Sequence, residues 1–443
     1  MRIPYGDTTI DVSLPECDVT VAEPPGGEPV DPREAAEEAI ADPHGPPLRE
    51  RVEADDEVAI VVTDVTRATP DDALVDMLVS ELAEAGIDRD QISIVVGLGL
   101  HRPMTDAELR EGLGEYADLA ENHDAEAVRE VGTVDGSGGE GSDGESDGTD
   151  GEEVQIQLNP TVADADAVVS TGMVEPHQYA GFSGGAKTAA IGAGGESLIG
   201  YTHGPAMLAR EGVRLGRAEG NPFRETLDRA GDLIGLDFCL NVTHGPSGGL
   251  ASDANETSEG ERSESSGVLG ASAGDHRAVV RDLADTARDS LSVEVEGSYD
   301  AVVAGVGAPK DANLYQATRA ATYVALGDYN PLSKGGRIVL SARLPEGAGE
   351  GTGEQRFYEW LSEAENADAL YDEMRRGYEA GAQRAFVVAR VLRNYDVYVT
   401  NSESSAVVED CLMHARESVE DAIEPGSDVL VVPDALDTLL VAG

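Results

Sequence analysis

The chain has 443 residues, of which 40% are hydrophobic and only 4% aromatic. This length exceeds what one ordinary hydrophobic core supports, so we expect two or three domains with cores built mainly from Val, Leu, Ile and Ala. The 31 Lys and Arg residues against 86 Asp and Glu residues give a net charge of −55, which argues against nucleic acid or an anionic membrane as a partner.

The acidic excess is spread along the whole chain and not gathered in one tail. Such a charge loosens a fold in dilute buffer, but the Debye length of about 3 Å in molar salt screens most of the repulsion. Long periodic apolar segments argue against a disordered acidic protein. We therefore interpret the composition as halophilic, that is, adapted to high intracellular salt.

Lysine is rare in this chain. Only three of the 31 basic residues are lysines, namely Lys187, Lys310 and Lys334. A lysine that remains is a candidate for a role that requires an amine.

The cysteines and the N-terminus indicate a protein of the cytoplasm. Cys17, Cys239 and Cys411 are far apart and form no CxxC pair, so neither a disulfide framework nor a cysteine zinc site is predicted. The N-terminus lacks the apolar core of a signal peptide, and no apolar run reaches the roughly 18 residues that a membrane helix needs. We expect a cytoplasmic location.

Short runs rich in Val and Ile alternate with helical segments along the chain. Helical periodicity predicts helices over 71–86 and 105–113. The runs predict strands at 58–62, 91–100, 165–174, 235–243, 299–307, 336–343, 395–402 and 428–434. Strands spaced by helices indicate βαβ units, so the predicted fold class is α/β with mainly parallel sheets flanked by helices.

The domain boundary is expected near residue 285, because a fresh α/β pattern begins after Val293. We therefore predict an N-terminal domain of residues 1–285 and a C-terminal domain of residues 286–443. Residues 136–153 and 251–267 are rich in Gly, Ser and acidic side chains, with nothing to bury. We interpret both as flexible surface insertions and not as active-site lids.

Polar residues follow the first predicted strand, where ligands bind in an open α/β sheet. Asp64 and Thr66 stand before a helix, and a helix cap accounts well for Asp64. Arg67 is harder to explain structurally, because an arginine in a strand-to-helix turn directs a planar fork toward a carboxylate or phosphate.

A second polar cluster follows the next strand, in Gly97-Leu98-Gly99-Leu100-His101-Arg102-Pro103. Its glycines are similar to a dinucleotide fingerprint, but the third glycine is missing. His101 directly follows a strand, where a lone histidine is more often structural than catalytic.

The densest polar stretch runs from Glu175 to Thr188 and reads EPHQYAGFSGGAKT. Its small residues allow the backbone to approach a ligand, and successive amides can form an anion-binding nest. It differs from a Walker A loop, because Ala186 stands where a glycine is required and no strand comes immediately before it. His203 follows in Tyr-Thr-His-Gly-Pro.

Together and in this order, the three clusters resemble the nickel-dependent lactate racemases and their 2-hydroxyacid racemase and epimerase relatives. The motifs are Asp-x-Thr-Arg, Gly-x-His-Arg-Pro, Glu-x-His-x-x-Ala-Gly-Phe-Ser-Gly-Gly-x-Lys and a later His-Gly. The resemblance continues in PKDANLYQ at 309–316 and in the ending VVPDAL. It covers essentially the whole chain outside the two acidic insertions.

The resemblance implies an isomerase that interconverts D- and L-lactate in a cleft between the two domains. It implies a nickel pincer nucleotide, a pyridinium mononucleotide with two sulfur-containing arms, held covalently through the Lys187 amine. It also implies a site assembled from both domains. The implied roles are acid/base for His101 and His177, nickel ligand for His203, cofactor contacts for Asp64, Ser183, Gly184 and Gly185, and substrate contacts for Arg67, Gln316 and Arg319.

The implied reaction moves hydride and not a proton, because a C–H beside a hydroxyl is too weakly acidic for histidine to deprotonate. One histidine would take the hydroxyl proton and the other would restore it on the opposite face of the substrate. Enzymes that synthesise the cofactor and insert nickel are the implied partners.

Two positions depart from the family pattern, since Ala186 replaces an arginine and Arg319 a lysine. The alternatives are a nicotinamide-dependent 2-hydroxyacid dehydrogenase and a non-catalytic nucleotide-binding protein.

Overall fold

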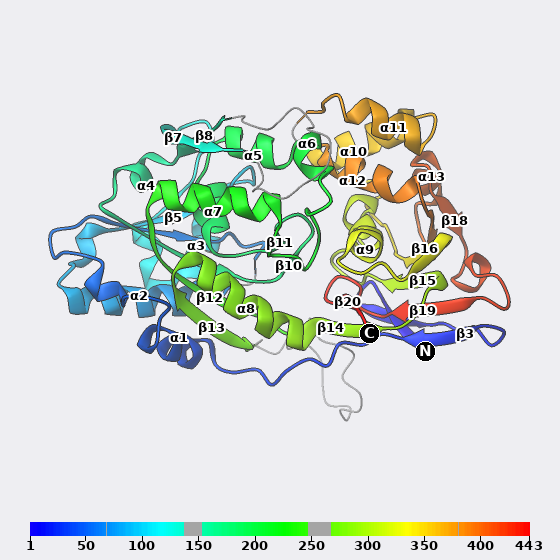
Figure 1. Cartoon of the computed structure of the whole chain (residues 1–443), viewed down its shortest axis with the longest axis horizontal. Helices are drawn as coiled ribbons and strands as arrows, with labels where there is room; N and C mark the ends of the chain where they lie inside the picture. The colour runs from blue at the N-terminus through cyan, green and yellow to red at the C-terminus, as the bar shows by residue number, and fades with distance from the viewer. Residues whose placement is uncertain (68, 137–152, 247–266, 380) are drawn as a thin grey trace.

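The computed structural model describes residues 1–67, 69–136, 153–246, 267–379 and 381–443. Two α/β domains lie side by side, each built around a six-stranded sheet (Figure 1). The predicted fold class is confirmed, and all eight predicted strands are present. The predicted insertions at 136–153 and 251–267 fall almost entirely outside the described residues.

The first sheet has the strand order β13-β12-β9-β4-β5-β6 and is parallel except for β13. Its strands are β4 (Val58–Val62), β5 (Ile92–Val96), β6 (Ala120–Asn122), β9 (Ala167–Met173), β12 (Leu236–Thr243) and β13 (Gly270–Gly274). Every residue of β4 and β9 is buried, as expected for central strands of a parallel sheet covered on both faces.

Helices cover both faces of this sheet because alternate residues of each strand point to opposite sides. Ile60 packs with helices α1 (Pro32–Ala41) and α2 (Asp71–Ala85) on one face. Val61 packs with α8 (His276–Leu291) on the other face. Helix α7 (Pro222–Ile234) lies beside α8 and contacts the hairpin of β7 (Arg129–Asp135) and β8 (Glu153–Leu158).

The second sheet is entirely parallel, with the order β18-β17-β16-β15-β19-β3. Its strands are β3 (Asp18–Val21), β15 (Tyr299–Gly305), β16 (Leu332–Ser341), β17 (Asp396–Thr400), β18 (His414–Arg416) and β19 (Asp428–Val432). Helices α9 (Leu314–Leu326), α10 (Thr352–Glu363) and α12 (Gln383–Leu392) form a core with one of its faces. The hairpin of β1 (Arg2–Tyr5) and β2 (Thr8–Asp11) contributes Ile3 to the core on the other face.

The remaining elements are short and connect these layers. They are the 3-10 helices η1 (Leu48–Glu50), η2 (Arg89–Gln91), η3 (Gly114–Leu119) and η5 (Glu420–Ala422), the π-helix η4 (Thr188–Gly192), the strands β10 (Pro176–His177), β11 (Gly181–Phe182), β14 (Ser292–Val295) and β20 (Leu439–Ala442), and the helices α3 (Asp106–Leu113), α4 (Pro160–Asp164), α5 (Glu196–Thr202), α6 (Pro205–Leu208), α11 (Ala367–Met374) and α13 (Ser405–Asp410).

The structure differs from the predicted domain boundaries at two places. Strand β3 pairs with β19, so the first 21 residues belong to the second domain, as Figure 1 shows at its right-hand side. Residue 285 lies inside α8, which packs on β12 and β13 of the first domain. The chain therefore enters the second domain for the second time only after Leu291, where β14 pairs with β20.

No helix within the described residues is both long enough and apolar enough to cross a membrane.

The net charge of −55 leads to a prediction for stability. We expect the melting temperature to rise by on the order of 10 °C between dilute buffer and molar KCl, because salt screens the repulsion among surface carboxylates. Differential scanning calorimetry across a KCl series measures this rise. Sucrose at matched osmolality is the control, and a melting temperature that KCl leaves unchanged would contradict salt adaptation.

Candidate active site

A cavity of about 510 Å³ opens between the two domains. The first domain lines it with the loops that follow β4, β5 and β9, and with α5. The second domain contributes Tyr315, Tyr378 and Gln383. The sheet order explains this position, since the chain moves from β4 outward to β5 and later returns to place β9 on the other side of β4. Loops diverge at such a switch point and leave a crevice beyond the strand ends.

His101 lies in the loop after β5, and Asp64 holds it in place. The distance between His101 Nδ1 and Asp64 Oδ2 is 2.6 Å. Burial acts to raise the pKa of Asp64, but hydrogen bonds with His101 and Thr66 outweigh it and lower that pKa to about 2. The carboxylate is therefore ionised and accepts a hydrogen bond from Nδ1, which directs Nε2 of His101 away from Asp64.

This contact corrects the expected helix-capping role of Asp64. The N-cap position of α2 is Pro70, and no side chain caps that helix. The Asp64 carboxylate is instead buried beside the cavity and accepts hydrogen bonds from Thr66 and His101.

His177 ends the short strand β10, which pairs with β11 through His177 and Gly181. Its Nδ1 accepts hydrogen bonds from the backbone amides of Tyr179, at 3.3 Å, and Ala180, at 3.1 Å. Burial, followed by the positive charge of Lys187, lowers the pKa of His177 well below its usual value. The imidazole is therefore neutral near pH 7, and in this arrangement its proton is on Nε2.

Lys187 immediately precedes η4 and presents its half-buried side chain to the cavity. Burial, followed by the charges of Arg67 and Arg224, lowers the pKa of Lys187 to about 7. Among the described residues its amine forms no ion pair. A large fraction of the amine is therefore unprotonated near neutral pH and able to act as a nucleophile.

His203 follows α5, and its Nδ1 lies 3.1 Å from the carbonyl oxygen of Ile199. A carbonyl only accepts, so Nδ1 carries the hydrogen and Nε2 keeps its lone pair. Burial, followed by the charge of Lys187, lowers the pKa of His203 to about 4. A neutral imidazole whose second nitrogen is fixed by a carbonyl is the form that binds a transition metal.

The glycine-rich loop presents Gly184 to the cavity but not Gly185. Both glycines have left-handed backbone angles, with φ of 76° and 58°. The Gly185 amide donates to the side chain of Asn241 at 2.7 Å, and a Cβ on Gly185 would lie 2.6 Å from Val280 of α8. Gly185 is not among the residues that line the cavity, and its expected cofactor contact stays a prediction.

Ser183 and Gly184 do line the cavity. The Ser183 hydroxyl donates to the carbonyl of Met173 at 2.6 Å and accepts from the amide of Glu175, so it braces the loop. The amide of Gly184 donates no hydrogen bond to any described residue, and it is the loop amide left for a ligand.

The substrate-binding candidates divide into two groups. Arg67 lines the cavity, and its Nη1 is 3.3 Å from Glu175. Gln316 and Arg319 lie one turn apart on α9, 3.5 Å from each other, and neither is among the residues that line the cavity. The charge of Arg319 nevertheless contributes to lowering the pKa of His177.

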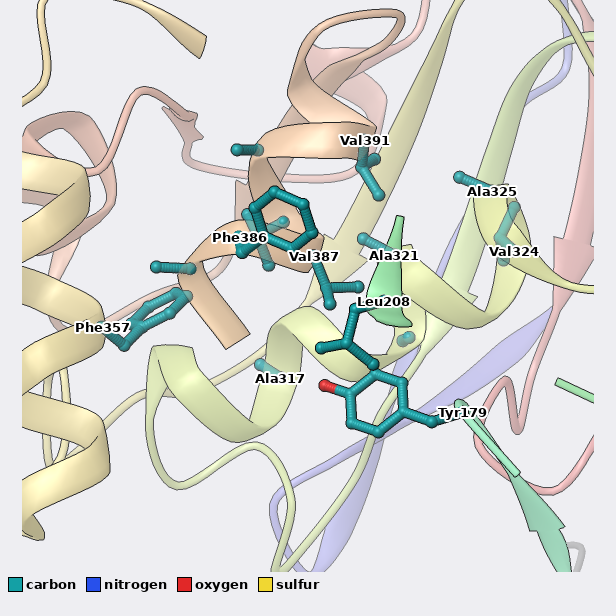
Figure 2. Packing of buried hydrophobic residues seen from close by; sticks show 14 of the residues in the cluster. Tyr179, Leu208, Ala317, Ala321, Val324, Ala325, Phe357, Phe386, Val387 and Val391 are labelled. Atoms are coloured by element: carbon teal, nitrogen blue, oxygen red, sulfur yellow. The ribbon is translucent and has the colours of Figure 1, made fainter. Parts of the chain in front are cut away.

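Sequence reasoning missed the residues through which the second domain holds the site. The Tyr378 hydroxyl donates to the carbonyl oxygen of His203 at 2.6 Å. Arg384 of α12 donates to the side chain of Gln178, the neighbour of His177, at 2.7 Å. Tyr179 and Leu208 pack against α9 and α12 of the second domain (Figure 2). The two hydrogen bonds join residues 175 and 206 positions apart, so no local sequence pattern predicts them.

The residues present fit a group that is held by one amine and one imidazole. No group of three or more His, Cys, Asp or Glu side chains in the described part of the chain could hold a metal ion by itself. A Cβ built on Gly200, which lines the cavity, has no atom within 4 Å, so there is space for a ligand beside α5. A metal at His203 would thus take most of its donors from a cofactor.

The fold and the site define a two-domain α/β enzyme with a lysine amine, three imidazoles and an arginine around one interdomain cavity. A family model described as the lactate racemase N-terminal domain matches residues 5–216, and one described as the lactate racemase C-terminal domain matches residues 295–440. The chain belongs to the lactate racemase family and is a racemase, an isomerase.

Two curated relatives are similar along nearly their whole length. Lactate racemase of Thermoanaerobacterium thermosaccharolyticum is 24% identical over 414 residues, covering 89% of this chain and 86% of the relative. Lactate racemase of Lactiplantibacillus plantarum is 25% identical over 421 residues, covering 92% of this chain and 91% of the relative.

Solved structures share the fold. The lactate racemase apoprotein of T. thermosaccharolyticum superposes with a TM-score of 0.80 at 22% identity, covering 99% of both chains. A Thermotoga maritima protein superposes with a TM-score of 0.62 at 18% identity, covering 94% of this chain and all of its own.

Proposed function

We propose that this chain interconverts D- and L-lactate with a nickel pincer nucleotide attached to Lys187. The observation that carries the proposal is the convergence of Lys187, His101, His177, His203 and Arg67 on one cavity. Family membership and the two curated lactate racemases support the substrate. The comparisons do not favour a nicotinamide-dependent dehydrogenase or a non-catalytic nucleotide-binding protein.

Lys187 would hold the cofactor through its amine, and Nε2 of His203 would bind the nickel. The amide of Gly184 has no partner among the described residues and would donate to the same group. When bound, the cofactor would supply an electron-poor ring that accepts a hydride and returns it.

Arg67 would bind the substrate carboxylate. One of its nitrogens contacts Glu175, and its remaining guanidinium N–H groups donate no hydrogen bond to a described residue. A planar fork suits a carboxylate, which accepts two parallel hydrogen bonds. Gln316 and Arg319 of α9 would complete the substrate contacts from the second domain.

The two histidines would handle the hydroxyl proton. His101 would take the proton on Nε2, while Asp64, which contacts Nδ1, would stabilise the imidazolium that forms. His177 is held with the proton on Nε2 and would donate a hydrogen bond to the oxygen of the 2-keto acid. Since His177 is neutral, it would take up a proton from solvent before giving one to the re-formed hydroxyl, while His101 would release its proton to solvent, so the proton count balances over one turnover.

We further propose a cytoplasmic protein of a salt-adapted cell that depends on enzymes of cofactor synthesis and nickel insertion. The net charge of −55 supports the first part, and the need to load Lys187 supports the second.

The test is a racemisation assay in molar KCl on protein purified from its native host. Each lactate enantiomer is supplied separately, and both are quantified by chiral chromatography. Nickel is measured by mass spectrometry, and the peptide that contains Lys187 is examined for an adduct. We expect racemisation in both directions, with nickel and an adduct on Lys187. Active protein with unmodified Lys187 would sink the proposal, and lactate-dependent reduction of free nicotinamide would favour the dehydrogenase.

A further inference from the structure

Two side chains at the start of helix α7 donate hydrogen bonds to the backbone of the glycine-rich loop, residues 175–188. Asn221, the N-cap of this helix, donates from Nδ2 to the carbonyl oxygens of Tyr179 and Arg217. Arg224, one turn later, is buried, with 3% of its surface exposed. Its guanidinium donates to the carbonyl oxygens of Phe182, Ser183 at 3.3 Å and Gly184 at 3.2 Å.

Three consecutive carbonyls directed at one guanidinium define the shape of the loop. In a planar trans peptide the C=O and N–H groups point in opposite directions, so the amides that follow these carbonyls face away from Arg224. One of them is the amide of Gly184, a residue that lines the cavity, and another is the amide of Gly185, which is fixed by Asn241. Lys187 follows two residues later and its backbone amide donates to the carbonyl of Gly184.

The guanidinium of Arg224 donates hydrogen bonds to the loop carbonyls, whereas its contact with the neighbouring carboxylate is longer. Asp228 lies 3.7 Å from Nη1, and its Oδ1 is buried with no hydrogen-bond partner among the described residues. Burial raises the pKa of Asp228, and the charges of Arg224, His276 and Arg277 oppose this shift. Burying an arginine costs free energy unless its N–H groups find acceptors, and here both terminal nitrogens donate to carbonyls of the loop.

We propose that Arg224 is a positioning residue, whose guanidinium shapes the backbone of residues 182–184 and thereby aims the amine of Lys187 into the cavity. The proposal rests on the proposed function only in taking Lys187 as the attachment point of the cofactor. Arg224 contacts neither substrate nor cofactor, and it acts through the loop and through its charge.

The charge of Arg224 also acts on Lys187. Four charged groups act on the amine: Arg67 and Asp64 in the loop after β4, Glu175 in the loop after β9, and Arg224 on helix α7. His177 and His203 are neutral near pH 7 because burial lowers the pKa of each. Arg67 and Arg224 lower the pKa of Lys187, whereas Glu175 and Asp64 raise it. Removing the charge of Arg224 should therefore shift protonation of the amine to higher pH.

The experiment is pulse acetylation of the full chain, produced in a host that lacks the cofactor. Acetic anhydride forms an amide bond with the amine, its acyl C–O bond breaks, acetate leaves, and the amine proton passes to water. Peptide mass spectrometry gives the rate at Lys187 as a function of pH, and acetylation of Lys334 gives an internal comparison. In the unchanged chain we expect the rate to rise with pH and to reach half its maximum near pH 7.

Two variants separate shape from charge. Arg224→Gln removes the charge, so the half-maximal pH should rise by about one unit and the maximal rate should fall about tenfold. Arg224→Lys keeps the charge but has no planar fork, so the half-maximal pH should stay and only the rate should fall. The control is Arg288→Gln, because Arg288 also contacts this loop, through the Phe182 ring and the carbonyl of Gly216, and should change neither value.

The outcomes decide the proposal in each case. A folded Arg224→Gln chain with unchanged rate and half-maximal pH overturns it. If that variant does not fold, Arg224→Lys decides alone: a reduced rate at unchanged half-maximal pH supports the proposal, and an unchanged rate overturns it. Acetylation involves neither nickel nor lactate, so these results stand whether or not the chain racemises lactate.

Discussion

Replacing Lys187 with arginine is expected to reduce racemisation to background and to remove the cofactor adduct. Arginine keeps a positive charge and fits a similar volume, but its guanidinium remains protonated and cannot form an amide-type bond. The native lysine differs because burial and its arginine neighbours lower its pKa to about 7, which leaves an amine able to react. Chiral chromatography measures turnover, and intact-mass analysis measures the adduct.

Lys334→Arg is the matched control for this substitution. Lys334 is exposed on β16 of the second domain, away from the residues that line the cavity. The control should retain the activity, nickel content and melting temperature of the unchanged chain. A Lys187→Arg enzyme that still racemises lactate at a normal rate would show that the amine does not carry the cofactor.

The second large effect is expected at the two histidines of the cavity. His101→Ala and His177→Ala should each lower kcat by about 10²–10⁴-fold in both directions, because each turnover needs a group that removes the proton and one that supplies it. Nickel content and the adduct on Lys187 should remain, since neither side chain is expected to hold the cofactor. Steady-state assays from each enantiomer measure the loss.

Asp64→Asn tests how His101 is prepared for this role. An amide cannot stabilise the imidazolium that forms on His101 as a carboxylate does, so we expect a smaller loss than for His101→Ala and a changed pH profile. The control is His44→Ala, because His44 is an exposed histidine that contacts Asp282 of α8 and not the cavity. A folded His177→Ala enzyme with normal turnover would break the two-histidine mechanism.

Much of the first domain could be predicted from the sequence because its central strands are continuous runs of buried Val, Ile and Ala. The strand over 58–62 matches β4 at both ends, and the helix predicted at 71–86 differs from α2 by one residue. Polar loops after β4, β5 and β9 were also predictable as site loops, because a parallel sheet brings these ends together. His101, His177, Lys187 and His203 do line one cavity.

What could not be predicted depends on partners distant in sequence. Strand β3 has four residues, none of them fully buried, and it is a strand because it pairs with the edge of β19. Gly184 and Gly185 are identical in type, and only the folded chain shows that Gly184 lines the cavity while Asn241 holds the amide of Gly185. Nothing in the local sequence distinguishes Arg224 from other arginines near the start of a helix, and only the fold brings it to the loop carbonyls. Hydrophobic periodicity and local motifs do not predict contacts between residues this distant in sequence.

The pairing of β3 with β19 has a consequence for how the chain is made. Residues 18–21 leave the ribosome about 400 residues before residues 428–432, with which they pair. At about 5–20 residues per second, this separation corresponds to a delay on the order of 20 to 80 seconds. During that time the first domain can fold while the N-terminal segment has no sheet to join. A shortened chain that begins after this segment would leave β19 as an unpaired edge strand and expose the face that Ile3 helps to bury, so we expect it to be less stable and more prone to aggregate.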